Sequence, residues 1–434
     1  METMGFISVI PAILAIVLSF ITRNTIVSLT IACIAGTLLA GQGIFGFPTL
    51  LQNSLGTTSF SWVMLLNTFI GILVAYFQKT GAIQGFSQKV HEKNLSRRGA
   101  QLMAWVLGIF IHFSDSFSPL FVGSVMRSIT DKAKVSREKL AYIADSTSAP
   151  VSVLMPITGW AAYLMGLAVG VGCIATTEDA SRLFLRAIPF NFYPIFAVLF
   201  VGLLASGIIK DFGPMKKAEK RAWEEGKVIR DGATPLIGKE LTDMQPYPGL
   251  KPRVVLNFIL PVFVIIGIAL GTYIAFDSAK TMEAFLFVVI IMTISMMIQG
   301  IPFKEVMNTL TDGVKGAIPA VMLLAVIFAV AAIMSFATGS SWGTFAICMP
   351  IALPLAFSFT DNQMSLLIVA CFAAVAGGGV FGDHCSPLSD TTVLSSTGAA
   401  SDHIDHVKTQ LPYALICGLL AFIAYLIIGI FFIQ

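Results

Sequence analysis

The chain has few charged residues, few histidines and no closely spaced cysteines. Asp, Glu, Lys and Arg make up 12% of its 434 residues, and there are five histidines. A soluble domain has about 25% charged residues, so this composition excludes an ordinary water-exposed surface. The 56% hydrophobic content and the mean hydropathy of +0.85 instead indicate a chain whose surface faces lipid.

The six cysteines are single and scattered, which excludes a Cys-X-X-Cys motif and a secreted disulfide framework. The first apolar run, residues 5–22, leads through Arg23 into a second apolar run without a small-residue cleavage site. We therefore expect this first run to be a retained membrane span rather than a cleaved leader.

About 20 apolar residues cross the hydrocarbon core as a helix, and the sequence predicts ten such spans. Two further apolar stretches, residues 101–126 and 338–358, are interrupted near their middles by Ser, Gly, Pro or Asp. Irregular backbone is tolerated at membrane depth where protein shields it, so both stretches are predicted to be re-entrant hairpins. The predicted spans are residues 5–22, 25–46, 60–78, 141–170, 183–209, 254–275, 283–301, 314–336, 364–398 and 411–433.

The basic residues are distributed unevenly between the two ends of these spans. With this layout, 24 of the 27 Lys and Arg residues fall on one side, and only Arg182, Arg186 and Lys280 fall on the other. The positive-inside rule assigns the larger group to the cytoplasm. We therefore predict a multi-pass protein of the cytoplasmic (inner) membrane with both termini outside. The charged linker 210–253 is predicted to be cytoplasmic, either as a mobile segment or as an amphipathic brace.

The layout has an internal symmetry, because five spans and one hairpin lie on each side of the linker. An odd number of spans places the second half upside down, and ADSTSAPVSVL at 144–154 echoes GDHCSPLSDTTVL at 382–394. The alternative is that the parity and the echo arise by chance. The expected fold is an all-α polytopic membrane protein, an inverted repeat with discontinuous helices and halves at 1–209 and 254–434. Such repeats are typical of secondary transporters, whose sites lie near the membrane midplane.

Several ionisable side chains fall inside the predicted membrane region. Charged groups at that depth are costly unless paired or hydrated, so each is a functional candidate, with a paired structural group as the alternative. The segments GGGVFGDHCSPLSDTT at 377–392 and DSTSAP at 145–150 combine helix-breaking residues with carboxylate and hydroxyl oxygens. Such oxygens suit a small hard cation such as Na⁺. The predicted ion-binding residues are Asp145, Ser146, Thr147, Ser148, Asp383, Ser386, Ser389, Asp390 and Thr391.

The two hairpin tips are expected to supply the remaining walls of the site. Broken helix ends present backbone N–H groups to the anionic parts of a substrate. Trp342 fits a substrate contact and a core position equally well. The predicted substrate-contacting residues are His112, Ser114, Asp115, Ser116, Ser118, Thr338, Ser340, Ser341, Trp342, Thr344 and His384.

Proton coupling requires a buried carboxyl group that exchanges a proton for a cation. Asp383 is the first candidate, followed by Asp145 and Asp115. His112 or His384 is the alternative, because histidine titrates near neutral pH. Na⁺ and H⁺ are the expected coupling ions, with no other cofactor, no transition-metal site and no nucleic-acid partner. The expected partners are the lipid bilayer and a small ion or small organic solute.

Two other motifs allow different interpretations. Residues 339–343, GSSWG, match the G-X-S-X-G nucleophile elbow, but no strand is predicted there. An intramembrane serine hydrolase using Ser341 is therefore the enzyme alternative to a carrier. Residues 402–406, DHIDH, have metal-ligand residue types at helical spacing, although a solvated helix start in a cytoplasmic connection fits better.

One long block carries a family resemblance. Residues 381–398, FGDHCSPLSDTTVLSSTG, continuing into DHIDHVKTQLPY at 402–413, closely resemble NhaC-type sodium/proton antiporters. Other blocks similar to that family are GSVMR at 123–127, SREKLAY at 136–142, DSTSAP at 145–150 and ATGSSWG at 337–343. The resemblance implies membership of the ion transporter superfamily, with scaffold and transport regions and often a homodimer.

The resemblance has one departure. Relatives commonly carry two adjacent aspartates in the first hairpin, whereas here Ser114 takes the first position and leaves Asp115 alone. The family also contains carriers of dicarboxylates and amino acids, so a hairpin lined by Ser114, Ser116 and Ser118 is compatible with an organic solute. Na⁺/H⁺ exchange is therefore the first functional prediction. A Na⁺- or H⁺-coupled carrier of an amino acid or carboxylate is the alternative.

Overall fold

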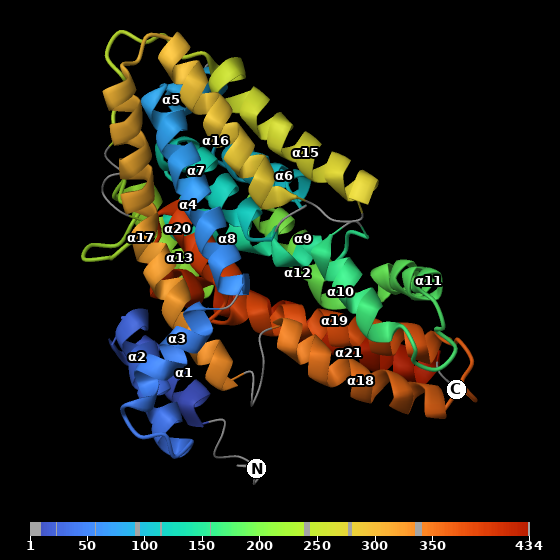
Figure 1. The fold of residues 1–434 in the computed structure, drawn as a ribbon. Helices are drawn as coiled ribbons and strands as arrows, with labels where there is room; N and C mark the ends of the chain where they lie inside the picture. The colour runs from blue at the N-terminus through green and yellow to red at the C-terminus, as the bar shows by residue number, and fades with distance from the viewer. Residues whose placement is uncertain are drawn as a thin grey trace.

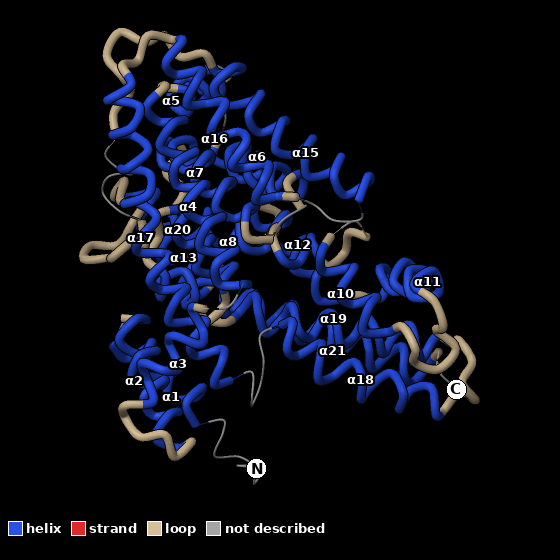
Figure 2. Tube along the Cα trace, in the orientation of Figure 1, coloured by secondary structure: helices blue, strands red, loops and turns tan. Residues whose placement is uncertain are grey.

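The structure is almost entirely helical. The computed structural model describes residues 10–22, 24–56, 58–91, 96–112, 115–156, 158–237, 244–276, 280–334 and 341–432. Two isolated β-bridges are the only strand-like pairings in these ranges, and Figure 2 shows helices joined by loops. The all-α prediction is therefore confirmed for the described residues.

Many helices follow the predicted apolar runs (Figure 1), but the predicted span 141–170 is divided among three helices and the predicted span 183–209 is broken near its start. The helices before the linker are α1 (Ile10–Thr22), α2 (Thr25–Leu39), α3 (Gly46–Leu55), α4 (Thr58–Lys79), α5 (Ala82–His91), α6 (Arg97–Phe110), α7 (Phe117–Lys132), α8 (Arg137–Ser146), α9 (Ala149–Ser152), α10 (Gly159–Ala168), α11 (Thr177–Ala187), η2 (Ile188–Phe190) and α12 (Phe192–Ser206). The linker and the second half contain α13 (Gly213–Glu224), η3 (Val255–Ile259), α15 (Leu260–Phe276), α16 (Thr281–Ile298), α17 (Phe303–Met334), α18 (Ser341–Ser358), α19 (Leu366–Cys385), α20 (Asp390–Ala399) and α21 (His403–Phe431).

Several of these helices have the length and composition of membrane spans. Among the described residues, α16, α19 and α21 each qualify, and the pair α11–α12, bent by 45°, forms a fourth candidate. Shorter apolar stretches lie at Ile26–Leu39, Met64–Lys79, Val255–Ala269 and Cys348–Ser358. These helices are consistent with a membrane protein, while the count of ten spans and the inverted repeat stay predictions.

The two predicted hairpins differ in the structure. Residues 101–126 fall on α6 and α7, two helices that pack on each other across a break. In the second predicted hairpin, residues 341–358 form the single helix α18 and residues 338–340 lie outside the described part of the chain, so this hairpin stays a prediction. Pro350 and Pro354 lie on the exposed side of α18. A proline removes one backbone hydrogen bond and kinks a helix, but at these exposed positions it does not reverse the chain.

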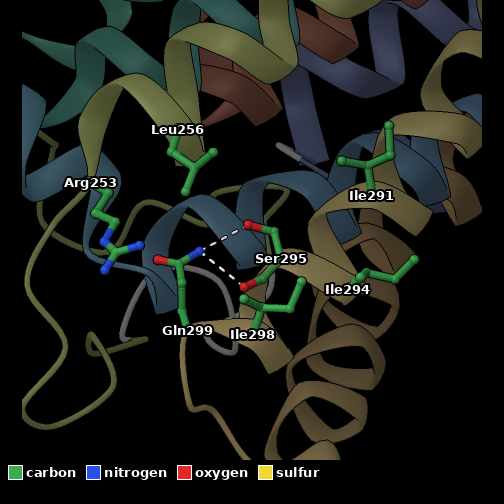
Figure 3. Close-up of a pocket in the computed structure, with 7 residues that line it drawn as sticks. All are labelled: Arg253, Leu256, Ile291, Ile294, Ser295, Ile298 and Gln299. Carbon is green, nitrogen blue, oxygen red and sulfur yellow. Dashed lines mark hydrogen bonds between the residues drawn. The ribbon is translucent and has the colours of Figure 1, made fainter.

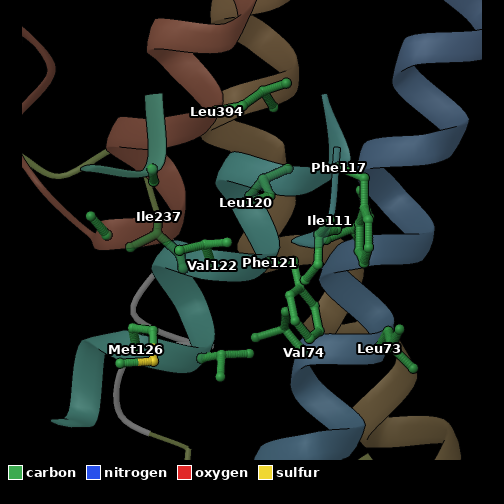
Figure 4. Close-up of a cluster of buried hydrophobic side chains, with 14 of the residues drawn as sticks. Leu73, Val74, Ile111, Phe117, Leu120, Phe121, Val122, Met126, Ile237 and Leu394 are labelled. Atoms are coloured by element: carbon green, nitrogen blue, oxygen red, sulfur yellow. The ribbon is translucent and has the colours of Figure 1, made fainter. Parts of the chain in front are cut away.

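The buried apolar side chains form two cores, and both halves of the sequence contribute to each. Figure 4 shows part of the first core, where side chains of α4, α7 and α20 gather. The second core joins α9–α12 with α18 and α19. The chain passes between the cores at several places, and two of these lie between Ala144 and Ala149 and between Val380 and Val393. These two crossings coincide with the breaks in helices that are described below.

The described linker residues, 210–237 and 244–253, are packed against the helices, as the brace alternative predicts. The Tyr247 N–H donates to the carbonyl of Lys79 at 2.8 Å, and Pro235 forms an isolated bridge with Asp402. The ion pairs that join the linker to the helices in the described residues include Arg97–Glu219, Glu138–Arg221, Lys139–Asp211 and Arg230–Asp405. The linker therefore contacts the basic connections at 79–98 and 127–139 and also the start of α21. These segments were all predicted to lie on the same side of the membrane, and in the structure they are in contact through the linker.

Candidate functional site

Two helix breaks meet between the cores. The first separates α8, which ends at Ser146, from α9, which has Pro150 near its start. The second separates α19, which ends at Cys385, from α20, and it contains Pro387. Proline disfavours a helical conformation of the residue before it, and Ser386, before Pro387, is extended. Pro150 lacks the N–H that would continue the hydrogen bonds of α8. The Ser146 Oγ and the His384 Nε2 lie 3.0 Å apart, so the structure brings the two segments together as expected.

Asp145 is the central carboxylate at the first break, and its side chain is fully buried. Its Oδ2 accepts a hydrogen bond from Nε2 of Gln410 on α21 at 2.7 Å, and His406 Nε2 lies 3.8 Å from the same oxygen. The Gln410 amide also donates to the carbonyl of His384. The other carboxylate oxygen of Asp145, Oδ1, has no hydrogen-bond partner within the described residues.

Hydroxyl groups of α20 surround this carboxylate. Thr391, Thr392 and Ser395 lie close enough to interact with Asp145. The Ser395 hydroxyl donates to the carbonyl of Thr391 at 2.7 Å, whereas the buried Thr392 Oγ1 lies near Asp145 but forms no hydrogen bond of ordinary geometry in the described part of the chain. A buried carboxylate oxygen and a buried hydroxyl, one from each break, are thus left for a ligand. Oxygen donors of these types can hold a small cation.

Asp383 and Asp390 flank the second break. Asp383 Oδ2 accepts a hydrogen bond from the Thr391 hydroxyl at 3.4 Å, and Asp390 Oδ1 accepts one from the Thr391 N–H at 3.0 Å. Ser389 caps α20 by accepting from the backbone N–H of Thr392. Asp383 lies within electrostatic range of Asp390, Asp145 and Asp115. The predicted carboxylates therefore gather in one region.

The connection between α6 and α7 forms one wall near this region. Asp115 Oδ2 accepts a hydrogen bond from the indole of Trp160 at 2.8 Å, and its Oδ1 accepts from the Ser116 N–H at 3.0 Å. The Ser118 hydroxyl is buried and donates to the carbonyl of Gly108 at 3.5 Å. Ser114 lies outside the described residues. Asp115 is thus held by protein groups on both oxygens, unlike Asp145.

His112 closes the same wall, because its carbonyl accepts a hydrogen bond from the Ser152 hydroxyl at 2.9 Å. Its Nδ1 lies 3.0 Å from the carbonyl of Ile109. The start of α18 is adjacent, since the rings of Trp160 and Phe345 lie 5.7 Å apart. Thr344, beside Phe345, is half-buried. Among the predicted residues of this segment, Thr338 and Ser340, and the side chains of Ser341 and Trp342, lie outside the described part of the structure.

Three predicted ion ligands form hydrogen bonds with nearby backbone groups. The Thr147 hydroxyl donates to the carbonyl of Ile143 at 2.8 Å, and the Ser148 hydroxyl donates to the carbonyl of Asp145 at 2.7 Å. The Ser386 Oγ accepts from the Leu388 N–H at 3.0 Å. Hydroxyls at helix breaks commonly make such local bonds. The structure therefore gives these three side chains a role in shaping the breaks.

Several residues of the site were not predicted from the sequence. Gln410 and His406 were left out because the apolar run of α21 begins after them, although a polar side chain beside a long apolar run was an available signal. Tyr193 was also missed, and its hydroxyl lies 2.7 Å from Nδ1 of His384. His384 is therefore held on both ring nitrogens, by Tyr193 and by Ser146.

The segment 402–406 starts a helix, as predicted, because Asp402 caps α21 by accepting from the backbone N–H groups of Ile404 and Asp405. The prediction that this start is solvated is wrong. His403 and His406 are buried, and their Nδ1 atoms lie 3.1 and 2.9 Å from the Ser396 hydroxyl. Among the described residues, no group of three or more His, Cys, Asp or Glu side chains is arranged to hold a metal ion.

Sequence relatives identify the family of this chain. Residues 151–329 and 314–430 match the profile of the Na⁺/H⁺ antiporter family. An uncharacterised Haemophilus influenzae protein is 31% identical over 490 aligned residues, covering 97% of this chain and 90% of that protein. A malate-2H⁺/Na⁺-lactate antiporter of Bacillus subtilis is 32% identical over 26% of this chain and 22% of its own length. An arginine/ornithine antiporter of Halobacterium salinarum is 33% identical over 24% of this chain and 22% of its own length. Because the family match covers more than half of its residues, this chain belongs to the Na⁺/H⁺ antiporter family.

Proposed function

We propose that this antiporter exchanges Na⁺ for H⁺ at Asp145, where the two helix breaks meet. The observation that supports this is the pair of buried polar atoms without hydrogen-bond partners in the described chain, Asp145 Oδ1 and Thr392 Oγ1. A buried polar atom that lacks a partner costs about 1–3 kcal/mol, and a charged one costs more. A bound Na⁺ or a proton on the carboxylate would remove that cost.

Competition for one carboxylate would couple the two ions. Na⁺ would bind the ionised carboxylate together with the hydroxyl oxygens of Thr391, Thr392 and Ser395, which lie close to it. A proton would instead neutralise the carboxylate and weaken the attraction for the cation. Because both ions cannot use Asp145 at once, each crossing would carry one of them, which is antiport.

Alternating access would follow from the division into two cores. The groups around Asp145 come from α8, α20 and α21, which lie where the chain passes between the cores. Movement of one core against the other would therefore open the site to one side and then to the other. Inverted repeats with broken helices work in this way, and we propose that the two halves of this chain form such a repeat.

The proposed orientation has the linker 210–253 in the cytoplasm and both termini outside the cytoplasmic membrane. It is supported by the gathering of the basic connections around the linker, since positive charge near membrane spans is enriched on the cytoplasmic side. A homodimer in the lipid bilayer stays a prediction from the family resemblance.

A second candidate is exchange of an organic solute coupled to Na⁺ or H⁺. It is favoured by the names of two relatives, a malate-2H⁺/Na⁺-lactate antiporter and an arginine/ornithine antiporter. In this chain the wall formed by Asp115, Ser116 and Trp160 would face such a solute.

Purified protein in liposomes separates these candidates. Vesicles are loaded with Na⁺ and a pH-sensitive dye, and then diluted into Na⁺-free buffer. Na⁺/H⁺ exchange predicts acidification of the lumen without any organic solute, because Na⁺ leaves as H⁺ enters. If pH changes appear only after lactate, malate, arginine or ornithine is added, the organic-solute carrier replaces the first proposal.

Asp145→Asn tests the assigned site in the same assay. The amide keeps the shape but loses the negative charge, so Na⁺-driven acidification is expected to fall to the level of empty vesicles. Asp361→Asn is the matched control, because Asp361 is exposed and has a positive φ of 47°, which asparagine tolerates. Full exchange activity in a folded Asp145→Asn protein would reject the role of Asp145.

A further inference from the structure

An open groove lies between the start of the segment η3–α15 and the end of α16 (Figure 3). Its volume is about 350 Å³. Four of its seven lining residues are apolar, and its polar residues are grouped toward one end. The lining residues are Arg253, Leu256, Ile291, Ile294, Ser295, Ile298 and Gln299.

The apolar wall of the groove is on the outside of the molecule. The exposed fractions are 37% for Leu256, 41% for Ile291, 52% for Ile294 and 81% for Ile298. Since α16 has the length and composition of a membrane span, its exposed aliphatic side chains face hydrocarbon rather than water. The occupant of this wall is therefore an acyl chain.

The polar end of the groove is held in a fixed shape. The amides of Asn257 and Gln299 form two reciprocal hydrogen bonds of 2.9 and 2.8 Å, and Gln299 also donates to the Ser295 hydroxyl at 3.0 Å. Asn257 is fully buried within the π-helix η3, whose wider turn directs it toward α16. The neighbouring Arg253 is exposed and makes no ion pair or side-chain hydrogen bond within the described residues.

The polar end of the groove lies at the depth in the membrane where lipid headgroups are found. The 18 residues of α16 span about 27 Å, close to the thickness of the hydrocarbon core, so the end of α16 lies at the membrane surface. Lys251 adds a second exposed cation beside Arg253, and no acidic side chain lines the groove. A guanidinium group binds phosphate through paired hydrogen bonds, so charge complementarity selects an anionic headgroup.

We propose that this groove binds one anionic phospholipid in the leaflet on the linker side. The phosphate contacts Arg253, and one acyl chain lies over Leu256, Ile291 and Ile294. This site is separate from Asp145, and the proposal depends on membrane insertion but not on the identity of the transported ion.

Native mass spectrometry of the full chain with phosphatidylglycerol or phosphatidylcholine tests the proposal. The wild-type protein is expected to retain one phosphatidylglycerol in preference to phosphatidylcholine. Arg253→Gln is expected to weaken phosphatidylglycerol binding about fivefold, which is the change in affinity that one basic residue near an anionic lipid contributes. Ile294→Trp, which fills the apolar wall, is expected to reduce retention of both lipids.

Lys280→Gln is the matched control, because Lys280 is exposed at the opposite end of α16. It is expected to retain phosphatidylglycerol like the wild-type protein. Equal losses in Arg253→Gln and Lys280→Gln would mean general charge attraction and would overturn the site. Unchanged retention in Ile294→Trp, or crosslinking of two copies through Ile294→Cys with no bound lipid, would also overturn it.

Discussion

The contact between α7 and α20 can be tested by adding a single methyl group. A Cβ atom placed on Gly123 would lie 2.5 Å from both the nitrogen of Ala399 and the carbonyl carbon of Gly398. Ordinary contacts of a Cβ atom are 3.4–4 Å, so Gly123→Ala requires the two helices to separate by about 1 Å. Both atoms that it meets belong to the backbone, so no side-chain rotation relieves the clash.

The expected cost follows from overpacking, which typically destabilises a core by about 1–3 kcal/mol. Because α20 also packs on α8, which carries Asp145, the same displacement is expected to change the positions of the Thr391 and Thr392 hydroxyls relative to Asp145. Gly123→Ala is therefore expected to lower the unfolding temperature in detergent and to reduce exchange activity in liposomes together.

Gly378→Ala provides the control for this experiment, because a Cβ atom on Gly378 meets nothing within 4 Å. Alanine is also more favourable than glycine in a helix by about 0.5–1 kcal/mol, so this variant is expected to be at least as stable as the wild-type protein. A Gly123→Ala protein that unfolds and transports like the wild-type protein would show that α7 and α20 are not packed this closely, and so would equal losses of stability in both variants.

The remaining predictions concern the linker and its neighbours. The Glu138 side chain is 2% exposed and forms an ion pair with Arg221, and burial raises the pKa of Glu138 despite this partner. Arg221→Gln would leave the buried Glu138 carboxylate without its partner. This variant is therefore expected to lower the unfolding temperature more than Glu138→Gln does. The double variant should recover part of the loss, and additive losses in a double-mutant cycle would disprove the pairing. The hydrogen bond from Lys79 lowers the pKa of Glu305 below its usual 4.5. The resulting stabilisation is present above pH 4.5 and is lost as the pH falls through the lower folded value. A small difference in unfolding temperature between wild type and Glu305→Gln should thus exist at pH 7 and disappear under acid conditions; a constant difference would contradict it.

Helix positions were predictable wherever hydropathy determines them. The predicted spans 60–78 and 283–301 correspond closely to α4 (58–79) and α16 (281–298), because uninterrupted apolar runs leave little choice of boundary. The breaks at 147–148 and 386–389 were also predictable, since glycine, proline and hydroxyl-bearing residues concentrate there. Local sequence was sufficient for these features.

Features that depend on distant partners were not predictable. The linker packs as a brace because pairs such as Glu138–Arg221 and Arg230–Asp405 form across the fold, and composition does not reveal such pairs. The predicted start of the last span at residue 411 missed the first eight residues of α21. His406 is polar yet buried, because Ser396 and Gln410 satisfy it, and hydropathy alone assigned it to solvent.

The concentration of polar groups between the two cores has a simple physical cause, with one exception. Breaking a helix frees backbone carbonyls, and buried carbonyls require donors. The Ser148 hydroxyl supplies one to Asp145, and the Gln410 amide supplies one to His384, so these side chains are explained by the breaks themselves. Asp145 Oδ1 and Thr392 Oγ1 serve no such need, and within the described chain neither has a hydrogen-bond partner. A carboxylate that only shapes a break would have both oxygens hydrogen-bonded in a low-dielectric interior. A carboxylate that binds a cation in one state and a proton in another needs an oxygen that no protein group occupies.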